Sequence, residues 1–148
     1  MVDIRSVDHI GIRVADIERA MRFYGLFGFT LEHRAENDAV VVMKNVHGVE
    51  LNLIYNANDD NGGKNILMDV PRKYAGYTHI AFRVASVADT IAMLRENDIT
   101  ITQGPVSFGR DGHVSLFLRD PDRTVIELRG REEDLSKLGD VEVYEPQN

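Results

Sequence analysis

An internal repeat constrains the fold of this chain more than any other feature of its sequence. The segment DHIGIRVA contains His9, and it returns as THIAFRVA, which contains His79, 70 positions later (79 − 9). Both segments alternate apolar and polar residues, which is the pattern of a β-strand with one buried face. A good helix N-cap follows each segment, Asp16 in the first copy and Ser86 in the second. Each half of the chain is therefore predicted to begin with a strand and a helix.

The predicted helices each have one apolar face, because apolar residues recur at the i, i+4 and i+7 positions. These residues are Ile17, Met21 and Tyr24 in the first half and Val87, Ile91 and Leu94 in the second. A short strand follows each helix, and then two strands joined by a polar turn. The paired strands lie at 40–43 and 49–54 in the first half and at 114–118 and 125–128 in the second. Their alignment matches Glu50 with Glu127, an offset of 77 (127 − 50).

The repeat predicts an α+β fold in which two βαβββ modules form a cupped mixed sheet with the helices on the outside. We expect a single domain over residues 1–130, with repeats at about 5–56 and 75–130 and a C-terminal extension at 131–148. The polar segment 56–77 between the repeats is interpreted as a linker or, alternatively, as a lid over a site.

The composition limits the classes of function. There are 24 acidic and 17 basic residues, and a formal net charge of −7 disfavours binding to nucleic acid. The absence of cysteine excludes disulfides, thiol nucleophiles and thiolate metal sites. No apolar run approaches the roughly 20 residues that span a bilayer, and residues 1–15 have no signal-peptide pattern. We expect a cytoplasmic protein that acts on a small molecule and binds neither nucleic acid nor a membrane.

Four side chains with metal-binding chemistry share one face of the predicted sheet. Alternate residues of a strand face opposite sides, so His9 and His79 lie opposite the apolar residues of their strands. Glu50 and Glu127 lie on the same face as these histidines. Two imidazoles and two carboxylates suit a divalent metal such as Ni, Zn, Mn, Co or Fe(II). Asn52 shares the strand face of Glu50, so a two-residue shift in register would place Asn52 beside the metal instead.

Other polar side chains accompany this predicted site. His47 is close enough in sequence to compete with Glu50 as a ligand. Arg13 and Arg83 face the same side as the histidines, and they can bind a substrate carboxylate or form ion pairs at the end of the sheet. His113 follows a glycine-flanked turn and can serve as an acid or base near the metal, although an ordinary hairpin turn is the alternative.

Four segments of the chain resemble the vicinal oxygen chelate superfamily, whose members include glyoxalase I, extradiol dioxygenases and bleomycin-resistance proteins. The segments are DHIGIRVADIERAMRFY, GVELNLI, THIAFRVASV and DPDRTVIELRG, and the resemblance covers roughly residues 5–130. It implies the paired βαβββ fold and a homodimer. It also implies that His9, Glu50, His79 and Glu127 are the metal ligands, as in glyoxalase I-like members, and that Glu127 doubles as the base that moves a proton.

The resemblance leaves the reaction open, because one scaffold serves several activities. The leading hypothesis is a metal-dependent lyase or isomerase of glyoxalase I type that acts on a small substrate with adjacent oxygens. In that reaction Glu127 removes a proton next to a carbonyl while the metal holds both oxygens. One alternative is an Fe(II) extradiol ring-cleaving dioxygenase, which needs two histidines and one carboxylate. The other is a metal-free drug-binding or metabolite-binding protein of resistance type.

Overall fold

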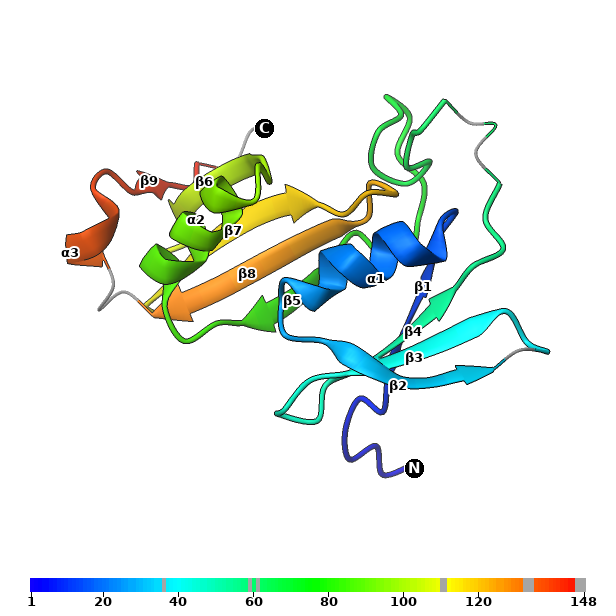
Figure 1. Cartoon of the computed structure of the whole chain (residues 1–148). Coiled ribbons are helices and arrows are strands. Elements are labelled where there is room, and N and C mark those ends of the chain that lie inside the picture. Colours follow the sequence, from blue (N-terminus) through cyan, green and yellow to red (C-terminus); the bar gives the residue numbers. More distant parts are fainter. Residues whose placement is uncertain (36, 59, 61, 110–111, 132–134, 146–148) are drawn as a thin grey trace. The chain divides into compact units, whose positions relative to one another are not determined.

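The computed structural model describes residues 1–35, 37–58, 60, 62–109, 112–131 and 135–145. The chain divides into two compact units, Met1–Lys64 and Asn65–Asn148. Each unit carries one βαβββ module built around its own mixed sheet (Figure 1). The mixed α+β class predicted from the repeat is confirmed. No helix in the described residues is long and apolar enough to cross a bilayer.

The first unit is a four-stranded sheet with one helix. Its elements are β1 (Ile10–Arg13), α1 (Ile17–Gly25), β2 (Thr30–Ala35), β3 (Val40–Lys44) and β4 (Glu50–Ile54). The strand order is β1-β4-β3-β2, with β1 parallel to β4 and the other neighbours antiparallel. The first and last strands of the module therefore lie side by side.

The second unit repeats this arrangement and extends it by one strand. Its elements are β5 (Ile80–Arg83), α2 (Val87–Glu96), β6 (Ile101–Ser107), β7 (His113–Arg119), β8 (Val125–Arg131), α3 (Leu135–Leu138) and β9 (Glu142–Val143). The order is β5-β8-β7-β6-β9, with β5 parallel to β8 and β9 parallel to β6. Part of the predicted C-terminal extension thus adds an edge strand to the second sheet.

The predicted helix caps are confirmed in both units. The Asp16 side chain accepts a hydrogen bond from the backbone N–H of Arg19 at 2.9 Å. The Ser86 hydroxyl oxygen accepts one from the N–H of Asp89 at 3.1 Å. Each cap satisfies a donor that the first turn of a helix leaves without a partner, so α1 and α2 begin where the sequence places them.

The helix faces follow the prediction in α2 and differ from it in α1. Val87, Ile91 and Leu94 of α2 are buried as predicted. In α1 the buried residues are Ala20, Phe23 and Tyr24, whereas Ile17 and Met21 are only half-buried. The reason is aromatic packing, because the Phe23 ring lies 5.2 Å from the Tyr24 ring and 5.1 Å from that of Phe27.

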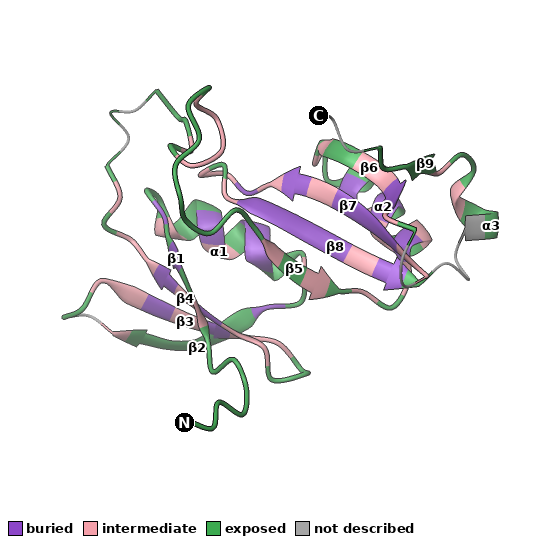
Figure 2. Ribbon diagram, turned by 180° about the vertical axis from the view of Figure 1, so that it is seen from behind, coloured by how far each residue is buried: buried purple, intermediate pink, exposed green. Residues whose placement is uncertain are grey.

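The second sheet is buried on both faces at its centre. Figure 2 shows β8 buried along most of its length. One face of β7 and β8 holds the apolar core residues Val114, Leu116, Leu118, Ile126 and Leu128. The other face holds two polar residues that are also buried, Ser115 and Glu127. Buried polar side chains need partners, and this pair lies at the candidate site.

Part of the predicted linker is attached to the second unit. The Asp69 carboxylate accepts hydrogen bonds from the Arg123 guanidinium at 2.6 and 3.1 Å and lies 3.0 Å from that of Arg119. It also accepts a hydrogen bond from the backbone N–H of Asn65 at 2.7 Å. The hydrogen bond from Arg123 is the main cause that lowers the pKa of Asp69 to about 2. The segment from Asn65 to Asp69 is therefore fastened to the turn between β7 and β8.

Candidate metal centre

The second unit brings together two of the predicted ligands, His79 and Glu127. His79 directly precedes β5, and Glu127 lies in the adjacent parallel strand β8, where it pairs with Ala81. Alternate residues share a face, so the side chains of His79 and Glu127 meet on the same side of the sheet. His79 Nε2 lies 3.0 Å from Glu127 Oε2. The carboxylate side chain is 8% exposed and the imidazole 36%, so the pair combines a buried oxygen donor with a nitrogen donor that solvent can reach.

The second oxygen of the Glu127 carboxylate contacts two other side chains, Ser115 and Arg129. The Ser115 hydroxyl, which is fully buried, donates a hydrogen bond to Glu127 Oε1 at 2.6 Å. Arg129 Nε forms an ion pair with the same oxygen at 3.5 Å. A buried carboxylate is costly unless it is paired and hydrogen-bonded, and these contacts meet that requirement. They also fix the carboxylate with Oε2 toward His79.

The orientation of the His79 ring is fixed by its neighbours. Thr78 Oγ1 lies 2.9 Å from Nδ1, and the ring meets that of Phe117 edge-on with the centroids 5.7 Å apart. When Nδ1 carries the proton and donates to Thr78, Nε2 keeps the lone pair that a metal ion requires. In that tautomer Nε2, which lies 3.0 Å from Glu127 Oε2, is the ring nitrogen of His79 that is available to a metal ion.

The first unit repeats the histidine arrangement. His9 Nδ1 lies 2.8 Å from Asp8 Oδ1, so in both units the residue before the histidine contacts Nδ1. This contact again leaves Nε2 as the atom for a ligand. The predicted partner Glu50 is engaged elsewhere, since its Oε2 lies 3.5 Å from Lys44 Nζ on β3.

The strand registers correct the correspondence between the two units. Gly11 pairs with Asn52 across β1 and β4, and Ala81 pairs with Glu127 across β5 and β8. Gly11 and Ala81 are equivalent in the repeat, so the counterpart of Glu127 is Asn52, at an offset of 75 (127 − 52). The predicted match between Glu50 and Glu127 was wrong by two residues. A two-residue shift keeps the alternation of faces intact, which is why the pattern alone did not detect it.

The three residues predicted to bind substrate have different surroundings. Arg13 is exposed, and its Nε donates a hydrogen bond to Asn56 Oδ1 at 2.9 Å. Arg83 is exposed at the end of β5. His113 begins β7, is half-buried, and has both ring nitrogens buried. Residues 110–111 of the turn before it lie outside the described residues.

Sequence reasoning missed Ser115, although it makes the shortest contact to the candidate ligand Glu127. Ser115 lies two residues before Phe117, which pairs directly with Glu127 across β7 and β8. The period of two places Ser115 on the same face as Glu127. Knowing which residues pair between β7 and β8 would have identified Ser115 as a neighbour of Glu127.

The donor types fit a divalent metal. Imidazole nitrogen and carboxylate oxygen are ligands of Zn, Ni, Mn, Co and Fe(II). Across the described parts of the chain, no three His, Asp or Glu side chains gather into a group that could hold a metal ion. The structure therefore provides one formed donor pair, His79 and Glu127, with its supporting contacts.

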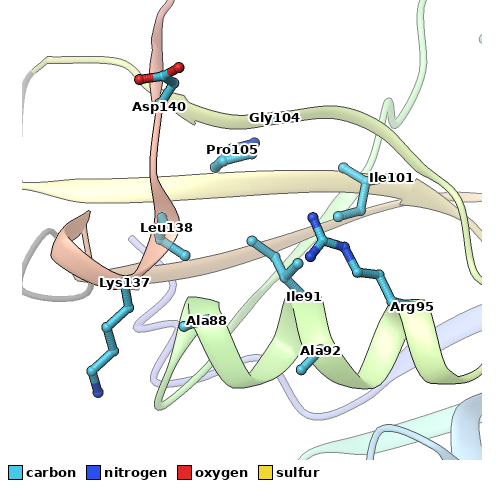
Figure 3. Close-up of a pocket in the computed structure, with 10 residues that line it drawn as sticks. All are labelled: Ala88, Ile91, Ala92, Arg95, Ile101, Gly104, Pro105, Lys137, Leu138 and Asp140. Atoms are coloured by element: carbon cyan, nitrogen blue, oxygen red, sulfur yellow. The ribbon is translucent and has the colours of Figure 1, made fainter.

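A surface pocket of about 360 Å³ lies at another place in the second unit, between α2, β6 and α3 (Figure 3). Its lining is mixed, with apolar Ile91 and Leu138 beside charged Arg95, Lys137 and Asp140. None of the predicted site residues lines it, so this pocket is separate from the candidate metal centre.

Comparisons with known proteins agree with this architecture. The family model described as the Glyoxalase/Bleomycin resistance protein/Dioxygenase superfamily matches residues 6–128. No curated protein sequence gives a significant match.

Solved structures share the fold at low identity. One is a glyoxalase/dioxygenase from Nostoc punctiforme, with a TM-score of 0.68 and 21% identity over 86% of this chain and 91% of that chain. An integron cassette protein from V. cholerae has a TM-score of 0.64 and 24% identity over 88% and 98%. A lactoylglutathione lyase from Agrobacterium tumefaciens has a TM-score of 0.60 and 18% identity over 86% and 95%.

Proposed function

The chain belongs to the Glyoxalase/Bleomycin resistance protein/Dioxygenase superfamily, and on this basis we propose that it is a metal-dependent lyase or isomerase of glyoxalase I type. Its substrate is a small molecule with adjacent oxygens. The observation that carries the proposal is the contact between His79 Nε2 and Glu127 Oε2, together with the hydrogen bond from Ser115 to Glu127 Oε1. His79 and Glu127 are the proposed ligands in the second unit. In the first unit the proposed histidine is His9, and the sequence suggests Glu50 as its carboxylate.

Glu127 is the proposed catalytic base. A bound divalent ion would polarise the substrate oxygens and stabilise the negative charge that develops when a neighbouring carbon loses a proton. Glu127 would accept that proton at Oε2, because Ser115 and Arg129 already hold Oε1. The same carboxyl group can return the proton to the adjacent carbon, which completes an isomerisation.

Three further residues are proposed to position the substrate. Arg13 and Arg83 are exposed cations that can pair with a substrate carboxylate. His113 is the proposed additional acid or base. The fold and the formal charge of −7 are consistent with a small-molecule substrate.

The Glu127→Gln variant tests the proposed function. Glutamine keeps the shape of the side chain but cannot accept the proton, so kcat should fall by at least about 100-fold. The assay follows the isomerisation of hemithioacetals formed from 2-oxoaldehydes and thiols, with metal content measured in parallel. Glu96→Gln, at an exposed residue that ends α2, is the matched control and should keep full activity. A Glu127→Gln protein that retained metal and full turnover would refute the base assignment.

A second candidate function is the Fe(II) ring-cleaving dioxygenase. It is favoured by the register that makes Asn52 the counterpart of Glu127, because two histidines and one carboxylate are the ligand set of such enzymes. Oxygen consumption by the Fe(II)-loaded protein with a panel of catechols tests it. Oxygen uptake coupled to ring cleavage would replace the lyase proposal, and its absence with active hemithioacetal turnover would reject the dioxygenase.

The assembly and location are further proposals. We propose that the protein is a cytoplasmic homodimer, as the family resemblance suggests. Light scattering after size-exclusion chromatography should give twice the chain mass of 16.7 kDa. A mass of one chain at micromolar concentration would reject the dimer.

A further inference from the structure

We propose that Asn52, and not Glu50, is the side chain of β4 that faces the metal-binding position of the first unit. This inference rests on the proposed metal-dependent function and changes the ligand set that it uses. The carboxylate of the second unit is then matched by a neutral amide oxygen in the first. Three observations support it.

The first observation is the strand register. In both units a strand with the pattern His-x-small-x-Arg runs parallel to the last strand of the module. The small residue is Gly11 in β1 and Ala81 in β5, and it pairs with Asn52 and Glu127 respectively. The antiparallel neighbours agree, because Asn52 pairs with Val42 and Glu127 pairs with Phe117, again 75 positions apart (117 − 42). Asn52 therefore occupies the place in the first unit that Glu127 occupies in the second.

The second observation is the state of the Asn52 side chain. Its Oδ1 atom is buried and has no hydrogen-bond partner among the described residues. Leaving a buried carbonyl oxygen without a partner is unfavourable, so such atoms in proteins usually accept a hydrogen bond from a donor or contact a cation. An amide oxygen is a competent ligand for hard and borderline divalent ions. The unpaired atom thus points to a ligand that binds beside β4.

The third observation is the surroundings of Glu50. Its register partner is Lys44, and its carboxylate forms an ion pair with that residue at 3.5 Å. The equivalent position in the second unit is Val125, which pairs with Arg119 and is an apolar residue. Two residues along a strand correspond to about 6.5 Å, so Glu50 and Asn52 cannot both take the place that Glu127 has in the second unit. Glu50 serves as the partner of Lys44.

Metal affinity in a matched pair of variants tests the inference. Asn52→Asp adds a carboxylate without changing the size of the side chain, and Glu50→Gln removes one in the same way. Both are titrated with Co²⁺ and followed by calorimetry and by the visible spectrum of the ion. We expect Asn52→Asp to bind Co²⁺ about tenfold or more tightly than the parent, because ligand charge raises affinity for a divalent ion. Glu50→Gln should bind within about twofold of the parent.

Further variants separate the possible failures. Asn52→Ala should bind Co²⁺ more weakly than the parent. It replaces Asn52→Asp as the test of the inference if circular dichroism shows that Asn52→Asp does not fold. Glu127→Gln, which reports on the second unit, should weaken binding by about tenfold or more. If Glu50→Gln weakens binding and the Asn52 variants do not change it, the inference is wrong while the proposed function stands. If Glu127→Gln leaves Co²⁺ binding unchanged, both the proposed metal site and this inference are wrong.

Discussion

Replacing Asp69 by asparagine tests how strongly the segment before β5 is fastened to the second unit. The Asp69 carboxylate contacts the guanidinium groups of Arg123 and Arg119 at 2.6 and 3.0 Å, and its side chain is 11% exposed. The hydrogen bond from Arg123 is the largest cause that lowers its pKa from 3.8 to about 2. At about 1.4 kcal/mol per pH unit, this difference corresponds to about 2 kcal/mol of stability at pH 7.

The pH dependence of this contribution has a definite sign. The folded-state pKa of Asp69 lies below its value in the unfolded chain, so the contribution is fully present above pH 4 and is lost as the pH falls toward 2. The Asp69→Asn variant should therefore be about 2 kcal/mol less stable than the parent at pH 7 and about 1 kcal/mol less stable at pH 3. Other carboxyl groups titrate in both proteins, so the difference between them isolates Asp69.

Urea unfolding followed by circular dichroism at pH 7, 5 and 3 measures this difference. Asp140→Asn, at an exposed position in the same unit, is the matched control and should stay within about 0.5 kcal/mol of the parent. An Asp69→Asn protein as stable as the parent at pH 7 would show that the ion pairs of Asp69 do not stabilise the folded chain. A loss of equal size at pH 7 and pH 3 would show that packing, not charge, carries the effect.

Three further changes have expected outcomes. Ser115→Ala removes the hydroxyl that donates to Glu127 Oε1 and should weaken Co²⁺ binding by about tenfold or more in calorimetry. Ser115→Thr keeps a hydroxyl and should bind Co²⁺ with an affinity closer to that of the parent. Equal affinity in all three proteins would contradict a positioning role for Ser115. Gly130→Ala places a methyl group against the stiff Val87 side chain at the start of α2 and should lower the free energy of unfolding by about 1–3 kcal/mol in thermal unfolding. In the control Gly25→Ala the added methyl group meets nothing within 4 Å, so the protein should not lose stability. Equal melting temperatures for both variants would refute the clash. Asp16→Ala removes the cap of α1 and should cost about 0.5–2 kcal/mol in urea unfolding, and an unchanged midpoint would show that the cap is dispensable.

Periodicity predicted much of the fold and the contact between two residues of the candidate site. The alternation of apolar and polar residues placed His79 and Glu127 on one sheet face, and the structure brings their side chains to 3.0 Å. The caps Asp16 and Ser86 set the starts of both helices. These features depend on residues that are close in sequence or on a pattern that repeats, so they can be predicted without a structure.

The remaining features depend on contacts that a sequence pattern does not specify. The match of Glu50 with Glu127 failed because a shift of two residues preserves the faces of a strand. Ser115 depends on the register between β7 and β8. The bond between Asp69 and Arg123 joins residues 54 positions apart, which no local signal predicts.

The proposed function depends on a metal held by His79 and Glu127, so the metal content per chain of the purified protein is the decisive measurement. Plasma mass spectrometry compares the untagged parent with two variants, His79→Ala and the control His33→Ala. His33 is exposed on β2. We expect about one divalent ion per chain in the parent and in His33→Ala, and its loss in His79→Ala. A parent that holds no metal after incubation with Ni, Zn, Mn and Fe(II), or a His79→Ala variant that keeps its metal, would contradict the proposed function.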